Sequence, residues 1–314
     1  MIELRRPWLV AGWPGMGHVA LAALTYLAAK LEASSFEELE APEFFDLGAV
    51  GVEGGVVRRP RYPRNQFLAW RNPSGARDLL LFVGEAQPSW RSYGFCGKVL
   101  DVAARVGVQR IFTFAAAPTA MHPSGRPRVF AVVNESSLLQ WIGRHDVPVM
   151  AEGQISGLNG LLLGAAAERR IEAVCLLGEL PFYAVAVPNP KASAAVLRVF
   201  STLAGIPLDL RELEEQGRLV EAGLVEMLER AQKSAEQPSE SSIPEAQPPE
   251  ETPPEPPEKK PPDVSTIKKI EDLFAAAQRD RSKALELKRE LDRLGLFRAY
   301  EDRFLDLFKR EEQA

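Results

Sequence analysis

Cysteine and histidine are scarce in this sequence, since its 314 residues include two cysteines and three histidines. Cys96 and Cys175 are far apart and lack the spacing of metal ligands, and a chain of this length does not depend on one disulfide. No HExxH motif and no cluster of His, Cys and acidic residues is spaced for zinc. We therefore expect no metal site and a reducing compartment, for which the cytoplasm fits best.

Long apolar runs and an excess of basic residues are also lacking. The longest apolar stretch, residues 19–29, has 11 residues, whereas a transmembrane helix needs about 20. The chain has 38 Lys and Arg against 43 Asp and Glu, a net charge of −5, and no region of it is basic. Nucleic acid selects a face rich in Lys and Arg. The sequence therefore predicts neither a membrane span nor a nucleic-acid partner.

Local signatures of catalysis and of cofactor binding are missing as well. The glycine-rich segment GWPGMG (12–17) has neither the dinucleotide-binding order nor the lysine of a P-loop. The segment GQISGLNG (153–160) lacks the G-x-S-x-G pattern of a nucleophile elbow. The sequence also lacks paired carboxylates of the kind that bind Mg²⁺, so ATP chemistry is not expected. We expect no cofactor, and no catalytic set is evident.

Composition divides the chain into three regions. Residues 1–232 have globular composition, whereas residues 233–262 contain ten prolines and seven glutamates and are predicted to be a disordered, semi-stiff linker. Residues 263–314 regain apolar spacings of three and four, which predicts C-terminal helices. Their last segment places Phe297, Tyr300, Phe304 and Phe308 on one face, a candidate partner-binding surface. This tail is expected to dock on its own subunit, on a second copy or on a partner.

The first region alternates apolar runs with helical periods, which predicts an α/β domain with a mixed sheet covered by helices on both faces. Strands are expected at residues 8–11, 79–84, 110–115, 129–133 and 172–178. Helices are expected at residues 18–31, 93–106, 135–144, 158–169 and 191–203. The glycine-rich segment 37–68 between them is expected to form short inserted antiparallel strands and turns.

The turns that leave the strands are where a ligand would bind in such a sheet. Gly12, Gly15 and Gly17 leave the first strand, and the amides there either hold an anion or form a tight connection to the next helix. Glu85 and Gln87 leave the second expected strand. A carboxylate there is a candidate general base or hydroxyl acceptor, or it caps the next helix.

The remaining candidate ligand-binding residues are Ser156 with Asn159, then Glu179, and then Arg58. Helix capping is the favoured role for Ser156, and Glu179 is a candidate because it follows a buried strand. Phe182 and Tyr183, which follow Glu179 in the sequence, are expected to line a groove or a subunit contact. Arg58 belongs to a cluster of four arginines that either binds phosphate or carboxylate or pairs with nearby acids; the other three are Arg59, Arg61 and Arg64.

Four segments follow one another within residues 2–232: GWPGMGHVA, GVEGG with the Arg-Pro-rich stretch after it, GEAQP, and residues 153–210. In this order, and most specifically through residues 153–210, they resemble the PAC2 family, the proteasome assembly chaperone 2 family. The resemblance implies a three-layer αβα domain similar to the phosphorylase/hydrolase-like fold and, in prokaryotes, homo-oligomers. Well-understood members of the family are non-catalytic chaperones that assist assembly of the proteasome α-subunit ring.

One departure from the family concerns the C-terminus. Some archaeal relatives end in a hydrophobic-Tyr-X tail that docks between proteasome subunits. Here residues 310–314 read REEQA, and Tyr300 falls within the helical pattern. Docking by that route is therefore not expected.

These observations leave two hypotheses. The first is a non-catalytic homo-oligomeric scaffold or assembly chaperone of the PAC2 type, whose partners are itself and subunits of a proteasome-like or other protein assembly. The second is a small-molecule-binding enzyme or sensor of nucleoside-phosphorylase-like fold, which acts on a nucleoside or a small anionic ligand.

Overall fold

The computed structural model describes residues 3–236, 270, 273–274, 277 and 283–293. The chain forms two compact units, Met1–Glu240 and Ser241–Ala314. No helix within the described residues is both long and apolar enough to cross a membrane.

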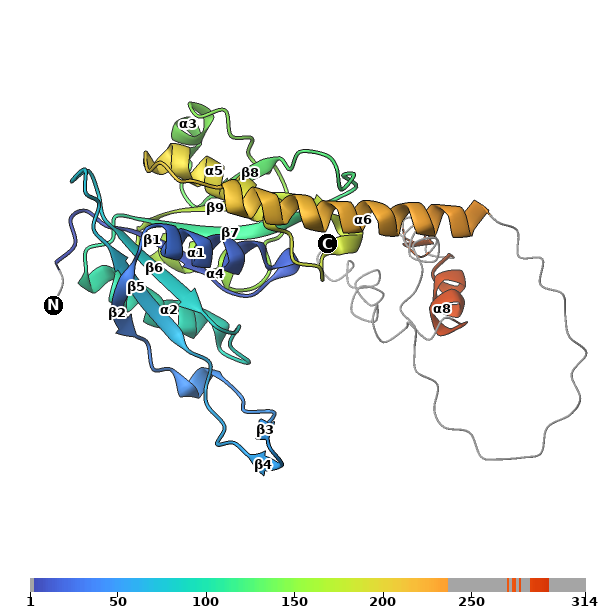
Figure 1. The fold of residues 1–314 in the computed structure, drawn as a ribbon, viewed down its shortest axis with the longest axis horizontal. Coiled ribbons are helices and arrows are strands. Elements are labelled where there is room, and N and C mark those ends of the chain that lie inside the picture. Colours follow the sequence, from blue (N-terminus) through green and yellow to red (C-terminus); the bar gives the residue numbers. More distant parts are fainter. Residues whose placement is uncertain (1–2, 237–269, 271–272, 275–276, 278–282, 294–314) are drawn as a thin grey trace, which may run out of the picture. The chain divides into compact units, whose positions relative to one another are not determined.

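The first unit is built on a seven-stranded mixed sheet with the strand order β2-β5-β6-β1-β7-β9-β8 (Figure 1). The strands are β1 (Trp8–Gly12), β2 (Ser34–Glu38), β5 (Asn65–Trp70), β6 (Leu79–Gly84), β7 (Arg110–Thr119), β8 (Val129–Val133) and β9 (Glu172–Pro181). The four central strands β6, β1, β7 and β9 are parallel, and the outer strands β5, β2 and β8 pair antiparallel to their neighbours. The predicted mixed sheet is confirmed.

Helices cover both faces of this sheet, so the predicted three-layer αβα arrangement is also confirmed. The helices are α1 (Val19–Lys30), α2 (Ser92–Arg105), α3 (Ser137–Gly143), α4 (Leu158–Glu168), α5 (Pro190–Ala204) and α6 (Arg211–Glu236). Trp8 and Val10 of β1 belong to one core, with buried residues of α1, α3, α5 and α6. Leu9 and Ala11 belong to the other core, with buried residues of α2 and α4. The alternation along the strand thus separates two apolar layers.

The segment between α1 and β6 contributes more to the main sheet than the sequence predicts. A small hairpin of β3 (Val52–Glu53) and β4 (Val56–Val57) lies apart from the sheet, as inserted short strands were expected to do (Figure 1). Strand β5, however, pairs with β6, and β2 pairs with β5 at the sheet edge. The sequence gives β2 little apolar signal, because its residues are SSFEE and none of them is buried.

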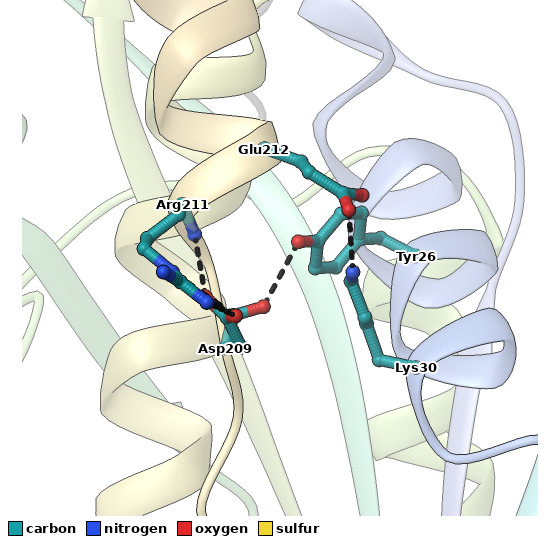
Figure 2. Close-up of polar contacts among 5 residues, drawn as sticks. All are labelled: Tyr26, Lys30, Asp209, Arg211 and Glu212. Carbon is teal, nitrogen blue, oxygen red and sulfur yellow. Dashed lines mark hydrogen bonds and ion pairs between the residues drawn. The ribbon is translucent and has the colours of Figure 1, made fainter.

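Helix α6 was not predicted, and polar contacts fix where it begins. The backbone N–H of Arg211 donates to Asp209 Oδ1 at 3.1 Å, and the Tyr26 hydroxyl of α1 donates to the Asp209 carbonyl at 2.9 Å. Lys30 Nζ lies 2.9 Å from Glu212 Oε1 (Figure 2). The start of α6 is therefore tied to α1, and Leu213 packs into the core shared with α1 and α5.

The far end of α6 reaches Glu236, four residues beyond the predicted end of the globular region at residue 232. In the second unit, α8 spans Ala284–Arg293. Ile270, Phe274 and Leu287 are buried there, at positions of the predicted apolar pattern. The candidate partner-binding residues lie outside the described residues, as does the predicted linker after Glu236; they are Phe297, Tyr300, Phe304 and Phe308.

Candidate functional site

The carboxyl ends of the parallel strands form the edge at which a ligand or partner would be expected. The chain places β6 and β5 on one side of β1 and then crosses to β7 and β9 on its other side. A strand order that reverses in this way leaves a crevice beyond the carboxyl ends of the central strands. We call this edge the carboxyl edge.

A cavity of about 450 Å³ lies at the carboxyl edge. It brings together three segments that are far apart in the sequence, represented by Gly15, Gln87 and the pair Ser156 and Asn159. Three of the candidate turns thus meet at one place. Gly12 ends β1 close by, where an added Cβ would lie 3.1 Å from Leu24 Cδ2.

Amide side chains hold these segments together. Gln87 Nε2 donates to the Pro14 carbonyl at 2.9 Å, and Gln87 Oε1 accepts from the Leu158 N–H at 3.1 Å. Gln87 therefore satisfies the first amide of α4. The expectation that Ser156 caps this helix is wrong. Gly157 occupies the N-cap position and forms no side-chain capping hydrogen bond.

The glycine turn after β1 is tightly hydrogen-bonded within the protein. Trp13 N–H donates to Asn159 Oδ1 at 3.3 Å, and Gly17 N–H donates to the Val185 carbonyl at 2.7 Å. Gly17 has a φ of 60°, and an added Cβ would lie 2.6 Å from Leu180 Cδ2. These contacts favour the interpretation of this turn as a tight strand-to-helix connection, since the amides of Trp13 and Gly17 are already used.

Glu85 lies apart from this cavity, in a more open cavity of about 480 Å³ that Arg58 also lines. Arg61 donates from both Nη atoms to the two Glu85 oxygens at 2.6 Å, and the Arg64 N–H donates to Oε2 at 2.7 Å. The hydrogen bonds from Arg61 lower the pKa of Glu85 from 4.5 to about 2. Arg58 pairs with Glu53 and Arg64 with Glu38, so three of the four arginines in this cluster are paired with acids.

Glu179 occupies a third place, at the end of β9 beside β8. Its side chain is nearly fully buried and accepts from Thr119 Oγ1 at 2.8 Å and from Arg128 Nη2 at 2.8 Å. The Arg128 N–H and Nε donate to the other oxygen, each at 3.1 Å. Hydrogen bonds from Arg128 lower the pKa of Glu179 from 4.5 to about 2. A pKa of about 2 makes both candidate carboxylates very weak bases, whereas a general base works best with a pKa near the operating pH.

Apolar side chains are exposed on the loops of the carboxyl edge. Met16 follows β1, Trp90 follows β6 and Phe182 follows β9, and their exposed fractions are 43%, 49% and 44%. Phe182 was predicted to line a groove or subunit contact, whereas nothing in the sequence distinguished Met16 or Trp90 from core residues. We call these three residues the apolar edge residues.

The described part of the chain contains no group of three or more His, Cys, Asp or Glu side chains that could hold a metal ion. Cys96 and Cys175 are buried and unpaired. Burial raises the pKa of each thiol from 9.0 to about 12, so neither is a ready nucleophile.

A sequence profile of the PAC2 family matches residues 9–228, which is more than half of the chain. The chain belongs to the PAC2 family. The match includes the sheet, the carboxyl-edge cavity and most of α6, so this PAC2 chain carries its candidate site within the family domain.

Solved structures agree with this assignment. The PAC2 chain is similar to Pyrococcus furiosus PbaB, an archaeal proteasome activator, with 30% identity and a TM-score of 0.62 over 72% of this chain and 95% of PbaB. A Mycobacterium tuberculosis proteasome-assembly chaperone homologue has the same fold, with 23% identity and a TM-score of 0.61 over 70% of this chain and 94% of its own. An uncharacterised protein of Methanocaldococcus jannaschii is 25% identical over 74% of this chain and 86% of its own length.

Proposed function

We propose that this PAC2 chain is a non-catalytic, homo-oligomeric scaffold or assembly chaperone that binds its protein partner through the carboxyl edge. The observation that carries the proposal is the group of apolar edge residues, Met16, Trp90 and Phe182, which are exposed on the loops that follow three of the parallel strands. Exposed apolar and aromatic side chains at one edge are typical of protein contacts. Single exposed apolar residues are common, so their position on three loops of one edge is what matters.

The partner class is suggested by the relatives. PbaB is described as an archaeal proteasome activator, and the Mycobacterium tuberculosis protein as a proteasome-assembly chaperone homologue. Subunits of a proteasome-like assembly are therefore the partners that we propose to test first. The aromatic residues predicted on the tail, among them Tyr300 and Phe304, are a second candidate contact.

The hypothesis of an enzyme or sensor has less support. A general base at the carboxyl edge would have to be Glu85 or Glu179, and arginine holds the pKa of each at about 2. The side-chain amide of Gln87, which lines the cavity, is already hydrogen-bonded to Pro14 and Leu158. A thermal shift of the full chain with nucleosides, lost in Glu85→Gln, would instead favour this second hypothesis.

Binding to proteasome α-subunits of the same organism tests the proposal. The full chain is expected to form a complex that native mass spectrometry detects. Replacing Trp90 and Phe182 together by alanine is expected to weaken the complex by about tenfold or more, because exposed aromatic residues are common binding hot spots. The control is Leu219→Ala on α6, which removes an exposed apolar side chain elsewhere.

The outcomes separate the parts of the proposal. A complex that the double variant forms as well as the natural chain would remove the carboxyl edge from the mechanism. A complex lost when Tyr300 and Phe304 are replaced by alanine would assign binding to the tail. Light scattering of the full chain tests self-association, and the mass of a single chain would contradict the homo-oligomer.

A further inference from the structure

A third cavity, of about 320 Å³, lies at the end of the parallel strands opposite the carboxyl edge. Trp8, Arg110 and Glu172 line it, and they are the first residues of the parallel strands β1, β7 and β9. Arg77 lines it from the loop just before β6. The cavity is therefore at the amino ends of the four parallel strands, far along the strands from the carboxyl edge.

Arginine and tryptophan side chains form the walls of this cavity. The Arg77 guanidinium carbon lies 3.8 Å from the Trp8 ring centroid, and the Arg110 guanidinium carbon lies 4.2 Å from the Trp141 ring centroid. Arginine stacked in this way keeps its N–H groups in the plane of the guanidinium, where they can still donate. One face of each of these tryptophan rings is thus covered by a guanidinium.

The two arginines differ in how their charge is compensated. Arg110 Nε donates to Glu172 Oε2 at 2.8 Å, and Nη2 donates to the same oxygen. Arg77 Nε is buried and has no hydrogen-bond partner, and no described carboxylate forms an ion pair with Arg77. Around the cavity, two positive charges are therefore matched by one negative charge.

An unmatched guanidinium that is partly removed from water is costly. Guanidinium remains protonated in proteins, so it cannot avoid the cost by losing its proton. Burial lowers the pKa of Arg77, and the positive charges of Arg110 and Arg6 lower it further. Since a buried charge is normally paired, an anion in the cavity would supply the negative charge that Arg77 lacks.

We propose that this cavity binds a small anion that carries a phosphate or carboxylate group, held by the unpaired guanidinium of Arg77. Such groups match the planar fork of arginine and accept two hydrogen bonds from it. Gln109, which also lines the cavity and is exposed, adds a neutral donor. The volume corresponds to roughly ten water molecules, which suits a phosphate with a small attached group or a di- or tricarboxylate.

The site is independent of the proposed protein-binding function, because it involves none of the apolar edge residues. The competing explanation is that Arg77 only stacks on Trp8 and that water satisfies its Nε atom. Phosphate also stabilises proteins in general, by exclusion from their surface. The competing explanation therefore predicts that any rise of the Tm is the same with and without the Arg77 guanidinium, so the two can be separated by experiment.

Thermal unfolding of the full chain tests the proposal with sodium phosphate and sodium citrate as probes, each against sodium chloride at matched ionic strength. At an anion concentration about 100 times the dissociation constant, we expect the Tm to rise by about 5 °C above the chloride value. A larger rise with phosphate assigns a phosphate ligand, and a larger rise with citrate assigns a carboxylate.

The decisive variant is Arg77→Met, which keeps most of the side-chain stem over Trp8 but removes the charge. The anion concentration for half of the Tm rise is expected to increase by about tenfold or more, as loss of a charged hydrogen-bond donor implies. In chloride, the Tm of this variant is expected to equal or exceed that of the natural chain, because an unmatched charge is gone. The matched control, Arg218→Met, removes an exposed arginine of α6 and should leave the anion response unchanged.

Two results would overturn the proposal. One is the absence of any rise of the Tm above the chloride value with either anion. The other is an equal rise in the natural chain, Arg77→Met and Arg218→Met, which would show a general ionic effect. If Arg77→Met does not fold, Arg77→Lys takes its place; lysine keeps the charge but lacks the planar fork, so this variant tests the fork alone.

Discussion

Replacement of Glu179 by glutamine tests whether this buried carboxylate is a structural anchor. Glu179 is 3% exposed, while the side chain of its partner Arg128 is 67% exposed. A pKa lowered from 4.5 to about 2 corresponds to about 3 kcal/mol of stability, at 1.36 kcal/mol per pKa unit. Glutamine keeps an acceptor oxygen but loses the charge, so we expect Glu179→Gln to lower the free energy of unfolding by about 2 kcal/mol at pH 7.

The stabilisation by ionised Glu179 depends on pH. Because the pKa of Glu179 is lower in the folded state, its stabilisation is complete above the unfolded pKa of about 4.5 and is lost as the pH falls toward about 2. The natural chain should therefore lose its advantage over Glu179→Gln below about pH 4.5, with roughly half of it gone by about pH 3. Urea denaturation at several pH values between 7 and 3 measures the difference.

A matched control and two possible results test the anchoring role of Glu179. Glu215→Gln removes an exposed carboxylate of α6 and should change the free energy of unfolding by less than about 0.5 kcal/mol. A difference for Glu179→Gln that is below about 1 kcal/mol at pH 7 would refute the anchoring role. So would a difference that is equal at pH 7 and pH 3, because the ionised form would then not be the stabilising one.

Two other predictions concern packing and thiol chemistry. An added Cβ at Gly84 would lie 2.3 Å from Trp13 Nε1, so Gly84→Ala should destabilise the chain by at least about 1 kcal/mol. At Gly164 in α4, no atom lies within 4 Å of an added Cβ, so Gly164→Ala should stabilise the chain by about 0.5 kcal/mol. Equal melting temperatures for these two variants would contradict the close packing on Trp13. Cys96 and Cys175, buried with pKa values of about 12, should react with a thiol reagent only after unfolding, and rapid labelling of the native chain would show that the thiols are accessible.

The fold could be predicted from the sequence where apolar periodicity is strong. The five strands expected from apolar runs all occur, and β8 has the predicted bounds, Val129–Val133. The weakly apolar elements could not be found in this way. Strand β2 lies at the sheet edge without a buried side chain, and α6 is strongly charged and buries only one side of the helix, for example at Leu213 and Leu224.

The candidate site was harder to predict because its contacts join distant segments. The sequence does indicate which turns leave the parallel strands, so Gly15, Gln87 and Asn159 were found as neighbours of one edge. It does not show that Gln87 serves an α4 amide 71 positions away. Nor does it show which apolar residues stay exposed, since Trp90 looks like a core residue until the tertiary structure is known.

Hydrogen–deuterium exchange of the full chain, alone and with proteasome α-subunits, tests the protein-binding role most directly. We expect slower exchange in the complex at residues 84–93 and 178–186, which contain Trp90 and Phe182, and no change around Arg77. A stable complex with unchanged exchange in both of these segments would contradict the account, because the partner would then bind elsewhere on the chain.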